Sequence, residues 1–600
     1  MATYTAPLKD MQFLLHEVIG LDRVTHLPGC EEVSADIVDA VLDECAKFSS
    51  DVLAPLNPIG DKAGAKWADG KVTTAPGFKQ AYQQFAAAGW TSISADPNYG
   101  GQGMPEFIST PIKEMIGSAN LSFSLCPMLT QGATEAIHLV GSDALKQKFL
   151  PPMVSGQWTG TMNLTEPQAG SDLAAIRTKA VPEGDHYRIF GQKIFITFGE
   201  HDFTENIIHT VLARTPTAPE GVKGISLFIV PKFLVNEDGS LGERNDVQCV
   251  SIEHKLGIHA SPTCVMQYGD KSGAIGYLVG EENRGLEYMF IMMNLARFAV
   301  GLEGVSIAER AYQHALAYAK TRLQGTELGK KGGPRVAIIQ HPDVKRMLLS
   351  MKSQTEATRA VAYYCAACLD NGARHPDPEV KKREQLRAEL MIPIVKGWST
   401  ETGQEVASTG VQIHGGMGFI EETGAAQYYR DARITTIYEG TTGIQANDLI
   451  GRKLGRDGGA TMQAMIVDME ATVEELNISS DADCKAIAAV LGYAINVLAD
   501  TTQWVLEAFS RNPQESAAGA VPYLMLFGTV TGSWMLGKSA LVAAKGIADG
   551  SGDPVFYQGK IKTARFYADH VLPRAFASAY EVTKGAESLL AIEDSALMIF

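Results

Sequence analysis

The chain has 600 residues, which is too long for one hydrophobic core, so three or four domain-sized units are expected. Charged residues make up 20% and apolar residues 45%, as in an ordinary soluble globular protein. The formal net charge of −16 argues against a role in binding nucleic acid, because phosphate neutralisation needs clustered Lys and Arg. A nucleotide held by backbone N–H groups stays possible.

Residues 1–158 are predicted to form a helix-rich first domain. In DIVDAVLDECAKFSSDVLAPLN, apolar residues recur at i, i+3 and i+4, and the predicted helix ends before Pro55. Residues 99–105 form a turn-rich loop, and helical segments over 111–137 and 143–153 follow. The first residues carry neither an apolar stretch nor an Arg-rich amphipathic one, so no secretory or organelle address is predicted.

A β-domain is predicted over residues 159–280. Its segments are short, rich in Ile, Val, Phe and Thr, and separated by Gly, Pro and Asn/Asp turns. Helices return over 281–455, and after a glycine-rich break at 451–460 a C-terminal helical extension is predicted over 461–600. Because helices and strands do not alternate along the chain, a Rossmann domain is disfavoured.

Two segments need separate interpretation. The segment Ser516–Gly537 carries no charge and has about the length of a membrane span. Its four glycines and one proline favour a buried helix or an oligomer contact instead. Cys365 and Cys368 form a CxxC in a helical segment without a second Cys or His pair, which favours two core cysteines over a metal site. The eight cysteines are scattered, as expected for reduced thiols in a cytoplasmic protein: Cys30, Cys45, Cys126, Cys249, Cys264, Cys365, Cys368 and Cys484.

Two motifs frame the predicted β-domain. NLTEPQAGSDLAAIRTKA contains Thr165, Glu166 and Ser171 around a Pro–Gly turn, which could offer hydroxyls and backbone N–H groups to a phosphate or a heterocycle edge. In the strand KIFIT, alternation predicts that Lys193, Phe195 and Thr197 share one face. A phenylalanine two residues from a threonine suits a flat ligand, although an ordinary half-buried strand would look the same.

The third motif centres on one carboxylate. VQIHGGMGFIEETG supplies Gly415, Gly416 and Gln412, and the segment RITTIYEGTTGIQ follows about twenty residues later. Between Arg433 and Asp448 the only carboxylate is Glu439, with no pairing partner nearby in sequence. It would serve either as a base or as a favourable charge before the helix that follows.

TEPQAGSD with KIFIT downstream, then QIHGGMGFIEE and IYEG, together resemble the acyl-CoA dehydrogenase family over roughly residues 35 to 455. The opening segment, the length and the C-terminal extension resemble the long bacterial members, including those of dimethylsulfoniopropionate breakdown. The resemblance implies a mainly α fold with a central β-domain and FAD as cofactor. The implied reaction is α,β-dehydrogenation of 3-methylmercaptopropionyl-CoA or another short to medium acyl-CoA.

The resemblance also implies site residues. Glu439 corresponds to the catalytic base, and the substrate would meet Ser171, Asn294, Arg297, Tyr438 and Gly440. Thr165 would bond the pyrimidine edge of the flavin, and Phe195 and Thr197 would cover its ring. The full set assigned to FAD is Thr165, Ser171, Phe195, Thr197, Arg322, Gln340, His341, Gln412, Gly415, Gly416 and Thr441.

Several positions depart from the family pattern. Asn163 stands where a small residue is usual, Phe195 replaces the more common tryptophan, and Gln427 occupies a position that is normally basic. About a dozen extra residues also separate Arg322 from Gln340.

The implied partners are an electron-transferring flavoprotein as acceptor and a second copy of the chain in a homodimer, with no nucleic acid and no membrane. Three alternatives stay open. The first is an acyl-CoA oxidase using O₂ and the second a long-chain acyl-CoA dehydrogenase. The third, a non-catalytic DNA-associated or structural flavoprotein, would need a basic surface or a lost base, and both the net charge and Glu439 count against it.

Overall fold

The computed structural model describes residues 3–330 and 332–598. These residues divide into two compact units, which are described separately. The first unit below takes in Glu44–Pro105 and Met115–Ala299; the second takes in the described residues of Met1–Asp43, Glu106–Glu114 and Val300–Phe600. The helices α3 (Ala35–Phe48), α6 (Glu106–Ala119) and α9 (Gly285–Thr321) each contribute residues to both units.

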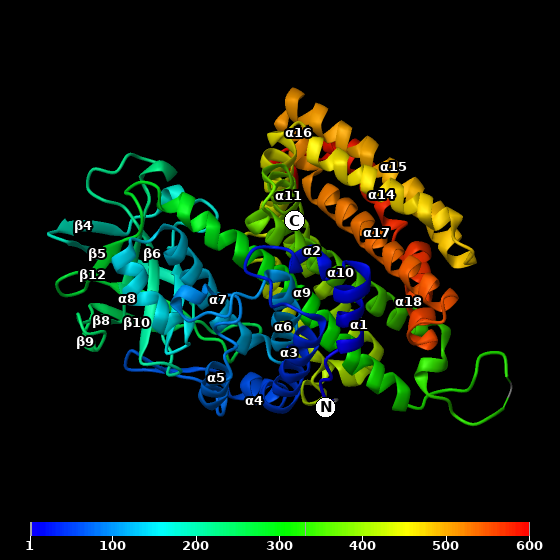
Figure 1. Ribbon diagram of the computed structural model, residues 1–600, viewed down its shortest axis with the longest axis horizontal. Helices are drawn as coiled ribbons and strands as arrows, with labels where there is room; N and C mark the ends of the chain where they lie inside the picture. Colours follow the sequence, from blue (N-terminus) through cyan, green and yellow to red (C-terminus); the bar gives the residue numbers. More distant parts are fainter. Residues whose placement is uncertain (1–2, 331, 599–600) are drawn as a thin grey trace. The chain divides into compact units, whose positions relative to one another are not determined.

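The first unit is built around one antiparallel sheet with helices against it. Within the described residues this sheet has eight strands in the order β10-β11-β5-β12-β7-β6-β3, with β4 beside β5. Among the described strands of this sheet, β3 and β6 alone pair in parallel, in agreement with the prediction against a Rossmann domain. Helices α7 and α8 lie against β3 (Figure 1). The strands are β3 Trp158–Asn163, β4 Lys179–Glu183, β5 His186–Thr197, β6 Asn206–Ala213, β7 Ser226–Pro231, β10 Val247–Ile252, β11 Thr263–Tyr268 and β12 Ala274–Leu278.

The helices of this unit are α4 Ala54–Ala63, α5 Phe78–Ala87, α7 Leu121–Val140 and α8 Asp143–Val154. A separate two-stranded sheet joins β8 (Phe233–Val235) to β9 (Leu241–Arg244). The predicted helix end before Pro55 is wrong. The chain continues from α3 through a π-helical turn, Ser49–Leu53, into α4, because Pro55 occupies the first turn, where its missing N–H costs nothing.

A hairpin in the predicted helix-rich region was also missed. Strands β1 (Lys66–Ala68) and β2 (Lys71–Thr73) pair antiparallel around Asp69 and Gly70. Both turn residues have positive φ, 49° and 76°, as the two-residue turns that favour Asp-Gly require. The Asp-Gly pair was a readable signal for this turn.

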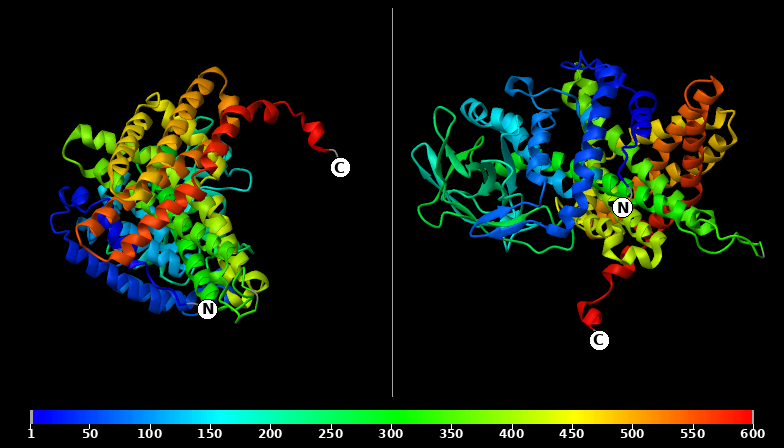
Figure 2. Two further views of the ribbon diagram at one scale, coloured as in Figure 1. Left: turned by 90° about the vertical axis from the view of Figure 1, so that its right-hand side faces the viewer. Right: turned by 90° about the horizontal axis from the view of Figure 1, so that it is seen from below.

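The second unit is helical. Its helices outside the extension are α1 Leu8–Gln12, α2 Asp22–Thr25, α10 Pro342–Arg374, α11 Pro378–His414, α12 Ala425–Ala432 and α13 Thr442–Asp448. The C-terminal extension adds α14 Ala460–Ile478, α15 Ala482–Arg511, α16 Pro513–Ala518, α17 Ala520–Ala548, α18 Pro554–His570, α19 Arg574–Lys584 and α20 Ala586–Leu590. Figure 2 shows the last residues, after α19, leaving the helical bundle.

The uncharged segment Ser516–Gly537 takes in the end of α16 and most of α17, and it is largely buried, in agreement with the first of the two predicted alternatives, a buried helix or an oligomer contact. Helix α17 packs against α15, α18, α10 and α11. The glycines explain its close approach to α11, because a Cβ added at Gly528 or Gly532 would lie within 2.3 or 2.7 Å of Trp398. Among the described helices, α9 and α15 are long and apolar enough to cross a membrane, and 71% and 39% of their most apolar windows are buried.

All eight cysteines are buried thiols outside any disulfide bond. Cys365 and Cys368 lie inside α10, and burial raises the pKa of both thiols. They are core cysteines, as predicted. No group of His, Cys, Asp and Glu suited to a metal ion occurs in the residues that the structure covers.

Candidate functional site

The predicted site residues fall into both units. Thr165, Ser171, Phe195, Thr197, Asn294 and Arg297 belong to the sheet-containing unit. Arg322, Gln340, His341, Gln412, Gly415, Gly416, Tyr438, Glu439, Gly440 and Thr441 belong to the helical unit. Each group is described within its own unit.

In the sheet-containing unit, Glu166 fixes the turn that carries Thr165. Its buried carboxylate accepts hydrogen bonds from Lys193 Nζ at 2.8 Å, from the Thr178 hydroxyl at 2.6 Å and from the Arg177 N–H at 2.6 Å. Burial opposes the charge, but the Lys193 ammonium and these hydrogen bonds lower the pKa of Glu166 to about 2. Glu166 is thus a structural anchor for the turn and not an exposed ligand donor.

Phe195 occupies a β-bulge in β5. The register against β11 shifts here, so that Ile194 and Phe195 together face one residue, and Phe195 has φ 59°. The strict alternation predicted for this strand is therefore wrong: Lys193 is fully buried, whereas the ring of Phe195 is 58% exposed. A non-glycine residue with positive φ and an exposed aromatic ring is unusual and points to function.

The bulge lies beside the predicted flavin-contacting hydroxyls. The Ile194 N–H donates to the Thr165 carbonyl oxygen at 2.9 Å, which draws the Thr165 turn against the bulged segment. Thr197 ends the same strand and is half-buried. A segment that carries an exposed phenylalanine and two nearby threonines has the flat surface and the hydroxyl groups that a heterocyclic ring system such as a flavin needs.

The other residues of this unit that the sequence singled out differ in how deeply they are buried. Ser171 is exposed in the loop after the Thr165 turn. On α9, Asn294 is half-buried and Arg297 is 4% exposed. Asn163 is buried in β3, where it donates to the Thr161 hydroxyl at 2.8 Å and accepts from the Tyr268 hydroxyl at 2.8 Å.

In the helical unit, Glu439 sits in a strained turn immediately before α13. Its φ is 55° and that of Gly440 is 89°, so two successive residues are left-handed. Such a conformation costs about 1–3 kcal/mol for a residue that is not glycine and must be held by its surroundings. The buried amide of Gln445 helps to hold this conformation, because its Nε2 donates to the carbonyl oxygens of Glu439 at 3.1 Å and of Gly440 at 3.3 Å.

Glycine is required at position 440. A Cβ there would lie 2.8 Å from the Gln445 amide nitrogen that holds the turn, and the positive φ disfavours any L side chain. Thr441 caps α13, with its hydroxyl accepting from the Ile444 N–H at 3.3 Å. The turn therefore presents the half-buried Glu439 between a fixed glycine and a fixed helix start.

The second clamp on this turn was missed by sequence reasoning. The hydroxyl of Tyr438 donates a hydrogen bond to Oε2 of Glu303, a buried residue of α9. Burial raises the pKa of Glu303 to about 8, and repulsion by Glu439 adds to the effect, while Tyr438 and Lys396 partly offset it. Tyr438 and Glu303 are 135 residues apart in sequence, so no local pattern could have paired them.

The predicted nucleotide-contacting residues lie at two exposed places in this unit. Gln412 lies in the last turn of α11, and Gly415 and Gly416 follow it in a solvent-exposed turn. Arg322 and His341 lie at the base of the extra loop, where the Ile338 N–H donates to the Arg322 carbonyl oxygen at 2.8 Å. Gln340 lies beside His341 and is partly exposed.

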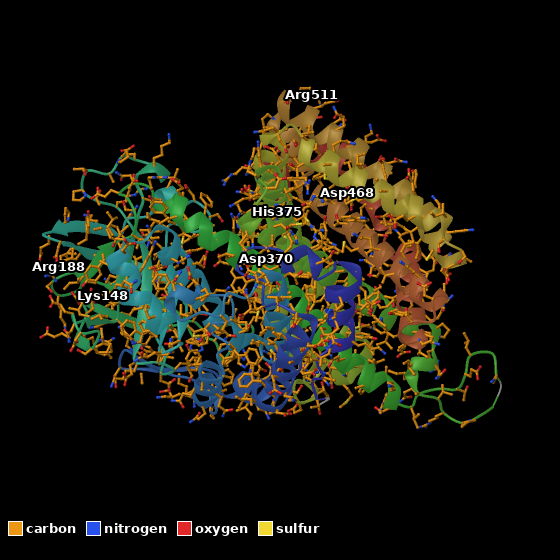
Figure 3. The ribbon with its side chains drawn as sticks, in the orientation of Figure 1. Lys148, Arg188, Asp370, His375, Asp468 and Arg511 are labelled. Carbon is orange, nitrogen blue, oxygen red and sulfur yellow. The ribbon has the colours of Figure 1, made fainter. Side chains whose placement is uncertain are left out.

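The helical unit also carries a groove of about 720 Å³ between α10, α11 and α14. His375 and Asp468, labelled in Figure 3, line it. Arg23 pairs with Glu384 at 3.0 Å, and Arg387 pairs with Asp468 at 2.7 Å. These two cations are therefore neutralised within the fold, and no predicted site residue lines the groove.

Comparison with known proteins resolves the family. Residues 39–157, 161–270 and 283–454 match the N-terminal, middle and C-terminal domain models of acyl-CoA dehydrogenases, and residues 465–593 match an acetyl-CoA dehydrogenase C-terminal-like model. The chain belongs to the acyl-CoA dehydrogenase family. It is an FAD-dependent oxidoreductase that acts on acyl-CoA thioesters, and the predicted fold class is confirmed.

Two relatives indicate the subgroup, and one solved structure shares the fold. The chain is 50% identical to a 3-methylmercaptopropionyl-CoA dehydrogenase of Ruegeria pomeroyi, over 98% of this chain and 99% of the relative. It is 36% identical to a butyryl-CoA dehydrogenase of Syntrophomonas wolfei, over 99% of each. An acyl-CoA dehydrogenase from Bacillus anthracis, solved with FAD, shares the fold at a TM-score of 0.74 and 21% identity, covering 98% of this chain and 93% of that one.

Proposed function

We propose that this acyl-CoA dehydrogenase oxidises 3-methylmercaptopropionyl-CoA to its trans-2-enoyl thioester, with Glu439 as the base that removes the α-proton. The observation that carries the proposal is the clamped left-handed turn at Glu439, which holds a carboxylate and its backbone N–H in one fixed orientation. The 50% identity to the Ruegeria pomeroyi enzyme supports the substrate.

The turn gives Glu439 two tasks. Its carboxylate accepts the α-proton, and a carboxylate becomes a stronger base as a bound substrate excludes water. Its own N–H is proposed to donate to the thioester oxygen, where negative charge develops; losing one such donor typically costs about 2.7–4 kcal/mol of transition-state stabilisation. Gly440 leaves room for the thioester beside this N–H, because it carries no side chain.

FAD, when bound, accepts the β-hydrogen as hydride. We assign the flavin ring to the exposed face of Phe195, with the Thr165 and Thr197 hydroxyls at its edge, and the phosphates to Ser171. Arg297 and Asn294 on α9 and the Tyr438 side chain are assigned to the substrate. Arg322, Gln340, His341 and Thr441 complete the proposed cofactor contacts.

A homodimer is proposed from the turn after α11. Gly415 and Gly416 are exposed there, close to Gln412, and Phe419 is 89% exposed beside them. An apolar ring exposed to this degree next to conformationally free glycines suits contact with a second copy of the chain, where these residues would meet the FAD of that copy. We further propose an electron-transferring flavoprotein as acceptor and a cytoplasmic location.

The test compares kcat/KM over a panel of acyl-CoA thioesters, using an artificial electron acceptor under anaerobic conditions. We expect the methylthio substrate to be preferred over straight-chain substrates of similar length. A preference of tenfold or more for long-chain thioesters would contradict the substrate assignment. Rapid reoxidation of the reduced enzyme by O₂ would favour an oxidase over a dehydrogenase.

A further inference from the structure

Glu303 is a buried carboxyl group that the proposed chemistry does not use. It lies on α9 with 5% of its surface exposed, and its Oε1 has no hydrogen-bond partner in the part of the chain that the structure covers. Its Oε2 accepts from the Tyr438 hydroxyl. A carboxyl group left half-satisfied in the interior is costly, so its presence beside the turn at Glu439 needs a physical explanation.

The hydrogen bond from Tyr438 ties Glu303 to the strained turn. Tyr438 directly precedes Glu439, whose φ is 55°. On the other side, the Gln445 amide holds the carbonyl oxygens of Glu439 and Gly440. The turn is therefore clamped on both sides of its strained backbone: through the Tyr438 side chain before it and through Gln445 after it. Releasing either clamp would let Glu439 relax towards an ordinary backbone conformation.

We propose that Glu303 is a positioning residue for the dehydrogenation: through the Tyr438 hydroxyl it fixes the turn at Glu439, and its protonation state controls the charge beside the developing enolate. This role rests on the proposed function of Glu439. It assigns Glu303 no contact with the substrate or the cofactor.

The charged and titratable groups around Glu303 come from two neighbouring elements. Tyr438 and Glu439 face it from the turn, and Lys396 faces it from α11, where the lysine is fully buried. Asp431 of α12 lies near Tyr438. Burial raises the pKa of Glu303 to about 8, so it carries a proton at neutral pH and loses that proton in the mildly alkaline range.

Ionisation of Glu303 should oppose the reaction. Proton abstraction moves negative charge from Glu439 onto the thioester oxygen, and the Glu439 N–H that would bind this oxygen adjoins Tyr438. A negative charge on Glu303 would lie one hydrogen bond from Tyr438, the residue before that N–H, and its burial leaves little solvent to screen the charge. We therefore expect kcat to fall about 5- to 10-fold as pH rises through about 8.

The experiment measures kcat and KM of the FAD-loaded enzyme from about pH 6 to about pH 9.5, a range that brackets the Glu303 titration. Glu303→Gln keeps an acceptor for Tyr438 but cannot titrate, so we expect the alkaline decline to disappear, with kcat at pH 7 about 2- to 5-fold lower. Glu303→Leu removes the acceptor, and we expect kcat to fall at least about 10-fold while KM changes less than about 3-fold.

Glu401→Gln is the matched control. Glu401 on α11 accepts from the hydroxyl of Thr442, the first residue of α13, at 2.6 Å. This variant alters a carboxylate beside the same turn and should keep the alkaline decline of the wild type. A Glu303→Gln profile that superimposes on the wild-type profile would overturn the role of Glu303.

Glu439→Gln separates this inference from the proposed function. If that variant is inactive with FAD bound, the assignment of Glu439 as the base is supported. The pH profiles of the Glu303 variants then test the positioning role of Glu303 independently. If Glu439→Gln keeps wild-type turnover, both the base and the role of Glu303 are overturned.

Discussion

The helical unit holds two groups of acidic side chains, and burial is offset by nearby charges to different degrees in the two groups. Around Arg359, which is 1% exposed, Asp10, Glu114 and Glu309 lie within 2.7 Å of the guanidinium, and Lys560 pairs with Asp10 from α18. Around Tyr438, by contrast, Glu303 and Glu439 repel one another. Lys396 attracts Glu303, but its charge only partly offsets the effect of burial.

The difference shows in the pKa of one acid from each group, Asp10 and Glu303; burial raises the pKa of Glu114 as well, although Arg359 partly offsets it. The Lys560 and Arg359 charges overcome burial and hold the pKa of Asp10 well below its usual range, so its negative charge is kept. Glu303 instead keeps its proton near neutral pH. Two close cations keep Asp10 charged, whereas Glu303, which lies beside a second acid, has a protonation state that changes near neutral pH.

The largest stability effect should follow removal of the central cation of the Arg359 group. Arg359→Met leaves three buried carboxylates short of a partner, so we expect a loss of about 3–5 kcal/mol in the free energy of unfolding. Denaturant unfolding of the FAD-loaded enzyme measures it. Arg188→Met, which breaks a surface pair with Glu183 (Figure 3 labels Arg188), should cost under about 1 kcal/mol. Equal costs for the two variants would contradict the comparison.

A smaller loss is expected for one acid of the same group. Asp10→Asn should cost about 2–3 kcal/mol at pH 7, because charged hydrogen bonds to Arg359 and Lys560 are weakened. The pKa of Asp10 is lowered by folding, so its stabilisation is present above the unfolded value of about 3.9 and is lost as pH falls below it. Wild type and variant should therefore converge in stability at acid pH; a constant difference from about pH 7 to about pH 3 would contradict this.

For Glu303 we expect the smallest effect on the free energy of unfolding at low pH. Its contribution to stability also changes with pH in the direction opposite to that of Asp10. The pKa of Glu303 is raised by folding, so the folded state binds more protons than the unfolded state between about pH 4.3 and pH 8, and stability falls with pH there. Glu303→Gln removes this dependence. Its stability should gain on the wild type by about 1.4 kcal/mol per pH unit at the steepest point, measured by urea unfolding at a series of pH values. Parallel stability curves for the two proteins across this range would contradict the raised pKa.

The sequence predicts the order of helices, sheet and helical extension because each depends on local periodicity. Glu439 could be singled out in the same way, because its neighbours Gly440 and Thr441 and the motifs upstream are contiguous signals; its role as the base stays a prediction. The buried helix over Ser516–Gly537 followed from its glycines, which the packing against Trp398 explains.

What the sequence could not predict depends on contacts between distant segments. Glu303 was the first acid after Arg297 on its helix, but only the fold brings it to Tyr438. Alternation predicted Lys193 and Phe195 on one face, and the bulge that separates them depends on the pairing of β5 with β11. Glu166 looked like part of a ligand-binding loop until its bond to Lys193 defined it as an anchor.

The central claim is that the carboxylate at the clamped turn is the base, and the reductive half-reaction tests it directly. FAD-loaded wild type and Glu439→Gln are mixed anaerobically with 3-methylmercaptopropionyl-CoA, and bleaching of the visible flavin band is followed. The account predicts that Glu439→Gln retains FAD and binds the thioester but bleaches about 10²–10⁴-fold more slowly. Bleaching of Glu439→Gln at the wild-type rate would contradict it.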